Sequence, residues 1–137
     1  MIEITIEGKP IPKGRPRFKR IGNFISTYTP SETVKKEQEI KDIFLIKYPK
    51  HIPLEGAVAF EAIVYMPIPK STSKKKTQKM INDEIKPIKR PDLDNIGKLV
   101  LDALNGLAFK DDSQVILFHT EKKYSNRPRI KIKVYEI

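Results

Sequence analysis

Residues 90–114 have the sequence RPDLDNIGKLVLDALNGLAFKDDSQ, in which apolar residues recur at three- and four-residue steps. From Leu93 to Leu107 this spacing predicts an amphipathic helix with one continuous apolar stripe. Gly106 is typical of the residue that ends such a helix. Because a helix with one apolar face buries it against another layer, the stretch predicts a domain in which this helix covers a sheet.

The segments around this helix predict the strands. Ile2, Ile4 and Ile6 alternate with polar residues, which indicates a half-buried strand. Residues 56–68, GAVAFEAIVYMPI, are rich in β-branched and aromatic side chains and predict a largely buried strand. Residues 114–124 and 129–137 predict two last strands, which the turn SNRP at 125–128 would join as a closing hairpin.

Two further helices are predicted from their starts. Residues 29–32, TPSE, combine a capping threonine, a proline at the first helical position and a glutamate three residues after the cap, and the helix should end near Lys47. Ser71 and Ser73 are candidate caps for a short basic helix. The resulting order is βαβααββ. We therefore expect one α+β domain over residues 1–137, with a mixed β-sheet of about four strands and helices packed on one face.

The charge of the chain indicates an anionic partner. Lys and Arg number 27 against 17 Asp and Glu, a formal net charge of +10, so nucleic acid is favoured over an anionic membrane. No apolar run approaches the roughly 18 residues of a membrane span. The acidic, alternating start differs from a signal peptide, and with no cysteine a cytoplasmic location is expected.

Five aspartates gather in residues 90–114 of this basic chain. Asp92 would be the N-cap of the helix and would contribute about 1 kcal/mol as a cap, with Asp94 favouring the helix dipole. Alternatively, Pro91 permits both carboxylates to turn toward one point. Asp94–Lys98 and Lys98–Asp102 are at i,i+4 spacing, and Asp102 is assigned to an ordinary solvated face.

A second acidic pair, Asp111 and Asp112, stands immediately before a predicted strand. Aspartate is common in turns, so a structural role is one interpretation. The other is that one of the two returns near Asp92, which requires the loop to double back. Converging carboxylates favour Mg²⁺ or Mn²⁺, and Lys98 could then steady a phosphate oxygen. These patterns leave a metal-dependent nuclease and a non-catalytic binder equally open.

Three short motifs favour the metal-dependent nuclease, because together they resemble those of a known family. Residues 92–98 fit D-x-D-N-x-x-K, residues 101–104 read LDAL, and residues 111–115 read DDSQV. Together they resemble the RusA family of Holliday junction resolvases. The resemblance implies a homodimeric, Mg²⁺-dependent endodeoxyribonuclease that resolves four-way junctions by paired symmetric nicks, with no other cofactor. It also implies catalytic, metal-binding roles for Asp92, Asp94 and Asp112, with Lys98 as the basic catalytic residue and Asp111 as the fallback third acid.

Residues 8–18, GKPIPKGRPRF, are similar to a stretch found in a phage and prophage branch of this family. A rigid basic loop is one interpretation. The other is phosphate contacts from Lys13, Arg15 and Arg17, with Phe18 wedged at the junction centre. Lys89 and Arg90 are further candidate DNA-binding residues, and residues 74–76, KKK, are either a solvated face or a DNA flank. The rival functions are a non-catalytic nucleic-acid-binding module and a nuclease for other branched DNA.

Overall fold

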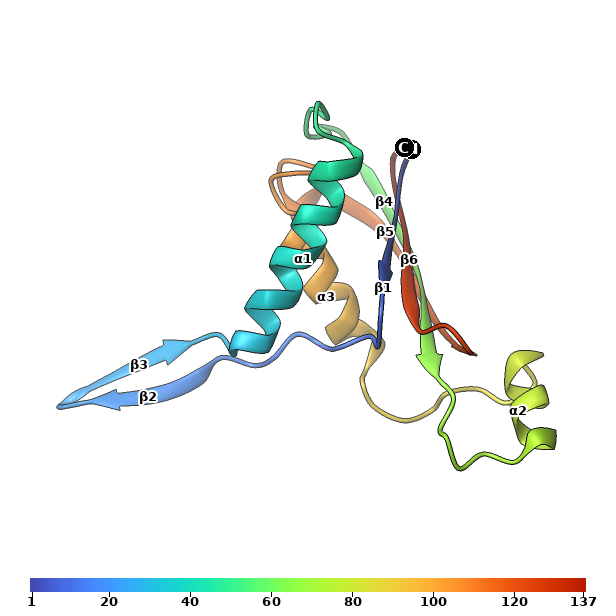
Figure 1. The fold of residues 1–137 in the computed structure, drawn as a ribbon. Coiled ribbons are helices and arrows are strands. Elements are labelled where there is room, and N and C mark those ends of the chain that lie inside the picture. The colour runs from blue at the N-terminus through green and yellow to red at the C-terminus, as the bar shows by residue number, and fades with distance from the viewer.

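The computed structural model describes residues 1–137 and contains six strands, three α-helices and one short 3₁₀ helix (Figure 1). In chain order they are β1 (Ile2–Glu7), β2 (Arg17–Ile21), β3 (Phe24–Tyr28), α1 (Ser31–Lys47), β4 (Val58–Pro67), α2 (Lys74–Ile81), α3 (Leu93–Leu104), η1 (Asp112–Gln114), β5 (Val115–Ser125) and β6 (Arg129–Glu136). The predicted α+β class with a mixed four-stranded sheet is confirmed. None of the helices is long and apolar enough to cross a membrane.

The sheet has the order β1-β6-β4-β5, and this order contradicts the predicted closing hairpin. β6 pairs antiparallel with both β1 and β4, whereas β5 pairs in parallel with β4 alone. The chain therefore passes across the end of β4 between its last two strands instead of folding back beside β5. Alternating side chains identify a strand but do not specify its neighbour, so this pairing was not predictable from the pattern.

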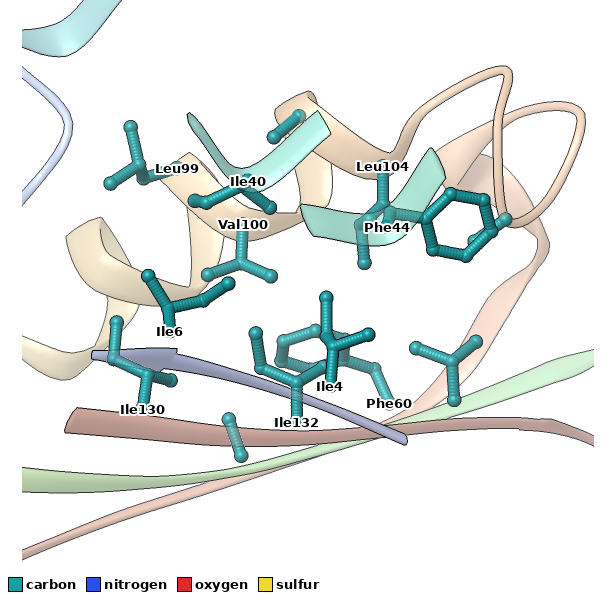
Figure 2. Close-up of a cluster of buried hydrophobic side chains, with 14 of the residues drawn as sticks. Ile4, Ile6, Ile40, Phe44, Phe60, Leu99, Val100, Leu104, Ile130 and Ile132 are labelled. Atoms are coloured by element: carbon teal, nitrogen blue, oxygen red, sulfur yellow. The ribbon is translucent and has the colours of Figure 1, made fainter. Parts of the chain in front are cut away.

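The core lies between the sheet and the two longer helices. Figure 2 shows Ile4, Ile6 and Ile132 of the strands pointing toward Phe44 of α1 and Val100 of α3. All of these side chains are buried, and each contributes roughly 1.5–3 kcal/mol of apolar transfer free energy. Apart from Gly97, the buried residues of α3 belong to the stripe that the sequence predicted: Ile96, Leu99, Val100, Ala103 and Leu104.

The helix starts differ in part from the prediction. α1 begins at Ser31 with Pro30 at the cap position and no side-chain cap, so the predicted Thr29 cap is wrong. Thr33 lies buried in the first turn, where its hydroxyl accepts a hydrogen bond of 2.8 Å from the Gly14 amide. Ser73 is the N-cap of α2, one of the two serines proposed for that role.

A two-stranded hairpin of β2 and β3 extends away from the body of the protein (Figure 1). The sequence predicts a basic loop over residues 8–18 and no strands here, so the hairpin is a correction to that prediction. The pattern was missed because no residue of either strand is buried, so there is no apolar face to mark the alternation. Gly22, with φ +59°, lies in the turn between the strands.

Candidate active site

The N-terminus of α3 presents two carboxylates to solvent. Asp92 occupies the N-cap position with extended backbone angles (φ −74°, ψ 143°), as predicted, but its side chain makes no capping hydrogen bond. Asp94 lies in the first turn, and both residues are exposed. The capping role considered for Asp92 is therefore not realised, and its carboxylate is left free for other ligands.

Asp92 lines a cleft of about 660 Å³ between the N-terminal loop and the start of α3. Four cationic residues line the same cleft: Lys9, Lys13, Arg15 and Arg90. Three of these, Lys13, Arg15 and Arg90, are among the residues that the sequence analysis assigned to DNA. A carboxylate surrounded by cations in an open cleft suits a phosphodiester, whose negative charge the cations offset, better than it suits an apolar ligand.

Lys13 fixes the N-terminal loop onto the helices. Its Nζ forms ion pairs with Asp102 and with Glu37, the second at 3.3 Å, and its backbone amide donates to the Asn95 carbonyl at 3.1 Å. Burial lowers the pKa of Lys13, but the hydrogen bond and the charge of Asp102, with those of Glu37, outweigh it, so the pKa lies above its usual 10.5. Lys13 therefore positions the loop, and two carboxylates share its charge.

The ion pairs of α3 differ from those predicted from the sequence. Asp102 pairs with Lys13, and neither of the i,i+4 pairs expected for Lys98 is present. The assignment of Asp102 to an ordinary solvated face is thus wrong. Lys98 is exposed and without a carboxylate partner in the chain, so its ammonium group is available to an anionic substrate.

Lys122 of β5 contributes to this region and was not among the residues predicted from the sequence. Its Nζ donates hydrogen bonds to the carbonyls of Lys89 and Pro91, at 2.9 Å and 3.1 Å. These bonds hold the segment that enters α3 and so fix the position of Asp92. No local signal in the strand pattern distinguishes Lys122 from Lys123 beside it.

The second acidic pair divides into two roles. Asp111 is the N-cap of η1: its carboxylate accepts from the Ser113 amide at 3.1 Å, and the Gln114 side chain accepts from the Asp111 amide at 2.8 Å. The hydrogen bond from Ser113 holds the pKa of Asp111 below its usual 3.8. Asp112 is exposed and takes no part in this capping box, so it is the member of the pair with a free carboxylate.

Within one chain Asp112 lies far from Asp92. Gln114, the last residue of η1 directly before β5, donates to the Gly56 carbonyl at 2.9 Å, whereas Lys122 of β5 contacts the start of α3. Eight residues of strand separate the two contacts, which corresponds to about 26 Å. The loop does not double back to the helix start, and no group of three or more acidic, histidine or cysteine side chains is placed to hold a metal ion.

The remaining candidates lie around the same region. Arg17 begins β2 and is exposed. Lys89 is exposed just before α3, and its carbonyl is held by Lys122. Residues 74–76 form the first turn of α2, which lies beyond the end of β4 (Figure 1). Cationic side chains are thus present on the hairpin, around the cleft and on α2.

Comparison with known proteins agrees with the motifs. Residues 7–135 match the family described as "Endodeoxyribonuclease RusA". The chain is also similar to "Uncharacterized protein YqaN" of Bacillus subtilis (strain 168), at 36% identity over 138 residues, a match that covers 99% of this chain and 96% of that protein. The matched region includes the aspartates at the start of α3, the residues that line the cleft, strands β4 and β5 and nearly all of β6. The protein therefore belongs to the RusA family of endodeoxyribonucleases, enzymes that hydrolyse DNA and resolve Holliday junctions.

Proposed function

We propose that the protein is a Mg²⁺-dependent homodimeric resolvase that cuts four-way DNA junctions with paired, symmetric nicks. The observation that carries this proposal is the cleft in which the free carboxylate of Asp92 lies among basic residues. Arg15 and Arg90 bind phosphates on either side of the scissile bond. Lys98 offsets the negative charge that develops on the phosphate during attack.

The acids of α3 fit a magnesium ion in part. Mg²⁺ commonly binds through one or two carboxylates and completes its shell with waters and substrate phosphates, so Asp92 and Asp94 would supply part of its ligands, and the resemblance to the family implies a third acid, Asp112. When bound, Mg²⁺ or Mn²⁺ supplies a Lewis acid that makes a water molecule nucleophilic near neutral pH. Asp112 of the same chain is too distant to join that set. A site with three acids therefore requires a second copy of the chain.

The free edge of β5 offers a surface for that second copy. β5 pairs with β4 on one side only, and apolar side chains are exposed along its first half, among them Ile116 at 68% and Phe118 at 45%. The Phe118 ring stacks on Phe60 at 5.3 Å and lies against Gly97, where a Cβ would collide with it. An exposed apolar edge strand favours pairing with another strand, and an identical copy can supply one in antiparallel register.

Such pairing also explains the distance between the acids. If two β5 strands pair antiparallel about Phe118, the first residues of one strand lie opposite the last residues of the other. The partner's Asp112 is then carried toward Lys122, which contacts the start of α3. Each of two symmetric sites takes Asp92 and Asp94 from one chain and Asp112 from the other, which matches paired nicks on opposing strands.

The first test is cleavage of a synthetic four-way junction. We expect paired symmetric nicks with Mg²⁺ or Mn²⁺, none with EDTA, and none with the Asp94→Asn variant, which should still bind the junction. Flap and linear duplex substrates at the same salt concentration serve as controls for selectivity. Equal cutting of flap and junction would contradict the resolvase proposal and identify a nuclease for other branched DNA.

A mixing experiment tests the shared site. Asp92→Asn and Asp112→Asn homodimers should each be inactive, but a heterodimer of the two, obtained by co-expression with different tags, has one site with all three native acids. We expect that heterodimer to nick one strand. If all acids act within one chain, both sites of the heterodimer lack an acid, and its inactivity would contradict the shared arrangement.

A further inference from the structure

The β2–β3 hairpin exposes apolar side chains without any cover from the rest of the chain (Figure 1). Ile21 and Phe24 face each other across the tip, and they are 57% and 78% exposed. A two-stranded hairpin alone is marginally stable in water, and exposed apolar groups add nothing to its stability. Their placement at the end farthest from the body of the protein therefore points to a role in binding.

Charge defines what the hairpin binds. Between Glu7 and Glu32 the chain contains no acidic residue and six cationic ones: Lys9, Lys13, Arg15, Arg17, Lys19 and Arg20. A segment with this charge repels a second copy of itself and attracts phosphate groups. A basic arm that ends in aromatic and aliphatic side chains is suited to DNA, where bases offer flat apolar surfaces wherever they are unstacked.

The base of the hairpin is fixed at the edge of the active-site cleft. Lys13 is paired with Asp102 of α3, and the Gly14 amide is bonded to Thr33 of α1. Gly14 packs so tightly that an added Cβ would lie 2.7 Å from the Thr33 hydroxyl oxygen. The strands that follow have five residues each, a length of about 17 Å, and they carry the tip away from that anchor. The hairpin thus starts from a fixed base beside the cleft and points away from it, which places its tip at a distance from any phosphate bound in the cleft.

Cross-strand pairs determine which residues act together, because partners in an antiparallel pair share a face. One face carries the tip pair Ile21 and Phe24, then Lys19 opposite Ser26, then Arg17 opposite Tyr28. Phe18 and Ile25 lie on the other face. The first face therefore combines an apolar tip with two cations in line behind it.

We propose that the hairpin tip, Ile21 and Phe24, inserts among unstacked bases at the centre of the junction while Lys19 and Arg17 bind the flanking phosphates. This inference rests on the proposed junction substrate. A linear duplex has no unstacked bases, so the tip contact raises affinity for junctions alone and contributes to their selection over duplex. The earlier expectation of a wedge at Phe18 is thereby replaced by one at Phe24, on the opposite face and nearer the tip.

The test uses a four-way junction with 2-aminopurine at the bases of the branch point, in EDTA so that binding is separated from cutting. We expect the fluorescence to rise when the full-length protein binds, because an unstacked 2-aminopurine is brighter. Phe24→Ala should lose most of this rise and bind the junction roughly 10-fold more weakly, with affinity for linear duplex within about twofold of the native value. Ile25→Ala is the matched control, since Ile25 is 73% exposed, adjacent in sequence and on the other face.

Each outcome decides the proposal. An unchanged fluorescence rise with Phe24→Ala, or an equal loss with Ile25→Ala, would overturn insertion of the tip while cleavage by the native protein upheld the resolvase function. A dimer that dissociates with Phe24→Ala in sedimentation would assign the hairpin to the protein interface and overturn it too. If the native protein bound and cut junctions no better than duplex, both the function and this inference would fail.

Discussion

Asp92 and Asp111 occupy the same position at the start of two helical segments and use their carboxylates differently. Both are N-cap residues with extended backbone angles, the first before α3 and the second before η1. Asp111 accepts a hydrogen bond from the Ser113 amide within its own turn, whereas Asp92 makes no such bond. A carboxylate satisfied by its own backbone contributes to local structure, and one left free among cations is available to a metal or a substrate.

The two aspartates differ because different contacts hold the backbone before α3 and the backbone before η1. The backbone before α3 is held by Lys122 from another strand, so that Asp92 keeps its place without using its side chain. Before η1 the restraint comes from the capping box of Asp111 and Gln114, and the Gln114 side chain also donates to the carbonyls of Leu54 and Gly56. A segment that a distant side chain holds in place thus leaves the carboxylate of its own N-cap residue free.

The largest expected effect is that of Asp92→Asn. If Asp92 binds the metal as proposed, its loss should cost more than the roughly 10–100-fold typical of losing a group that only supports a metal ligand, so cutting should fall below about 1% of the native rate. Stability should change by less than about 0.5 kcal/mol, because no capping bond is lost. Gel analysis of junction cleavage and thermal unfolding measure the two quantities.

Asp111→Asn is the matched control for that variant. Asparagine caps helices about as well as aspartate, so both cutting and stability should be retained. If Asp111→Asn abolished cutting, Asp111 would be the third acid and the distinction between the two N-cap residues would no longer hold.

Lys122→Met should have the next largest effect. Without the two bonds to the Lys89 and Pro91 carbonyls the start of α3 is less well placed, and we expect cutting to fall about 10-fold. Junction affinity in EDTA should change much less, which separates positioning from binding. Lys122→Arg, which keeps the charge and donor groups, should recover part of the rate, and Lys123→Met should be nearly neutral.

The contact between Lys13 and Asp102 should have a smaller effect. Asp102→Asn removes one of the two carboxylates that hold the N-terminal loop at the cleft, and we expect cutting to fall severalfold. A double-mutant cycle with Lys13→Met measures the coupling in thermal unfolding, expected near 1 kcal/mol since both side chains are largely shielded from solvent. Additive effects would show that Lys13 acts independently of Asp102, as a phosphate ligand.

The smallest effect is a pH-dependent one, from Asp111→Ala. The pKa of Asp111 is lower in the folded protein than its usual 3.8, so its ionised form stabilises the fold. That stabilisation is fully present above the unfolded pKa and disappears as the pH falls through the lower folded pKa. The melting temperature of Asp111→Ala should therefore lie slightly below the native value at neutral pH and converge with it below pH 3.8. A constant difference across that range would exclude an ionic cap.

Short stretches of sequence determined several helix boundaries and the family motifs of this protein. The stripe of α3, the end of α1 before Pro49, the Ser73 cap and the motif of the family all lie within short stretches, where backbone preference and periodicity act over a few residues. The extended N-cap position of Asp92 was also predictable, because aspartate directly before an apolar helical repeat is a favoured N-cap residue and N-cap residues have extended backbone angles. The candidate acids are identified by the resemblance of their motifs to the RusA family, since the local patterns alone leave a structural role equally open.

Only the tertiary structure decided how these parts are placed. Sheet order put β6 beside β4 and left β5 as a free edge. β5 runs from the end near Asp112 to the start of α3, so most of the length of a strand separates Asp112 from Asp92. Contacts from Lys13 to Asp102 and from Lys122 to Pro91 join residues far apart in sequence. The free energy of such contacts depends on which surfaces meet when the layers pack, and no short stretch of sequence contains both partners.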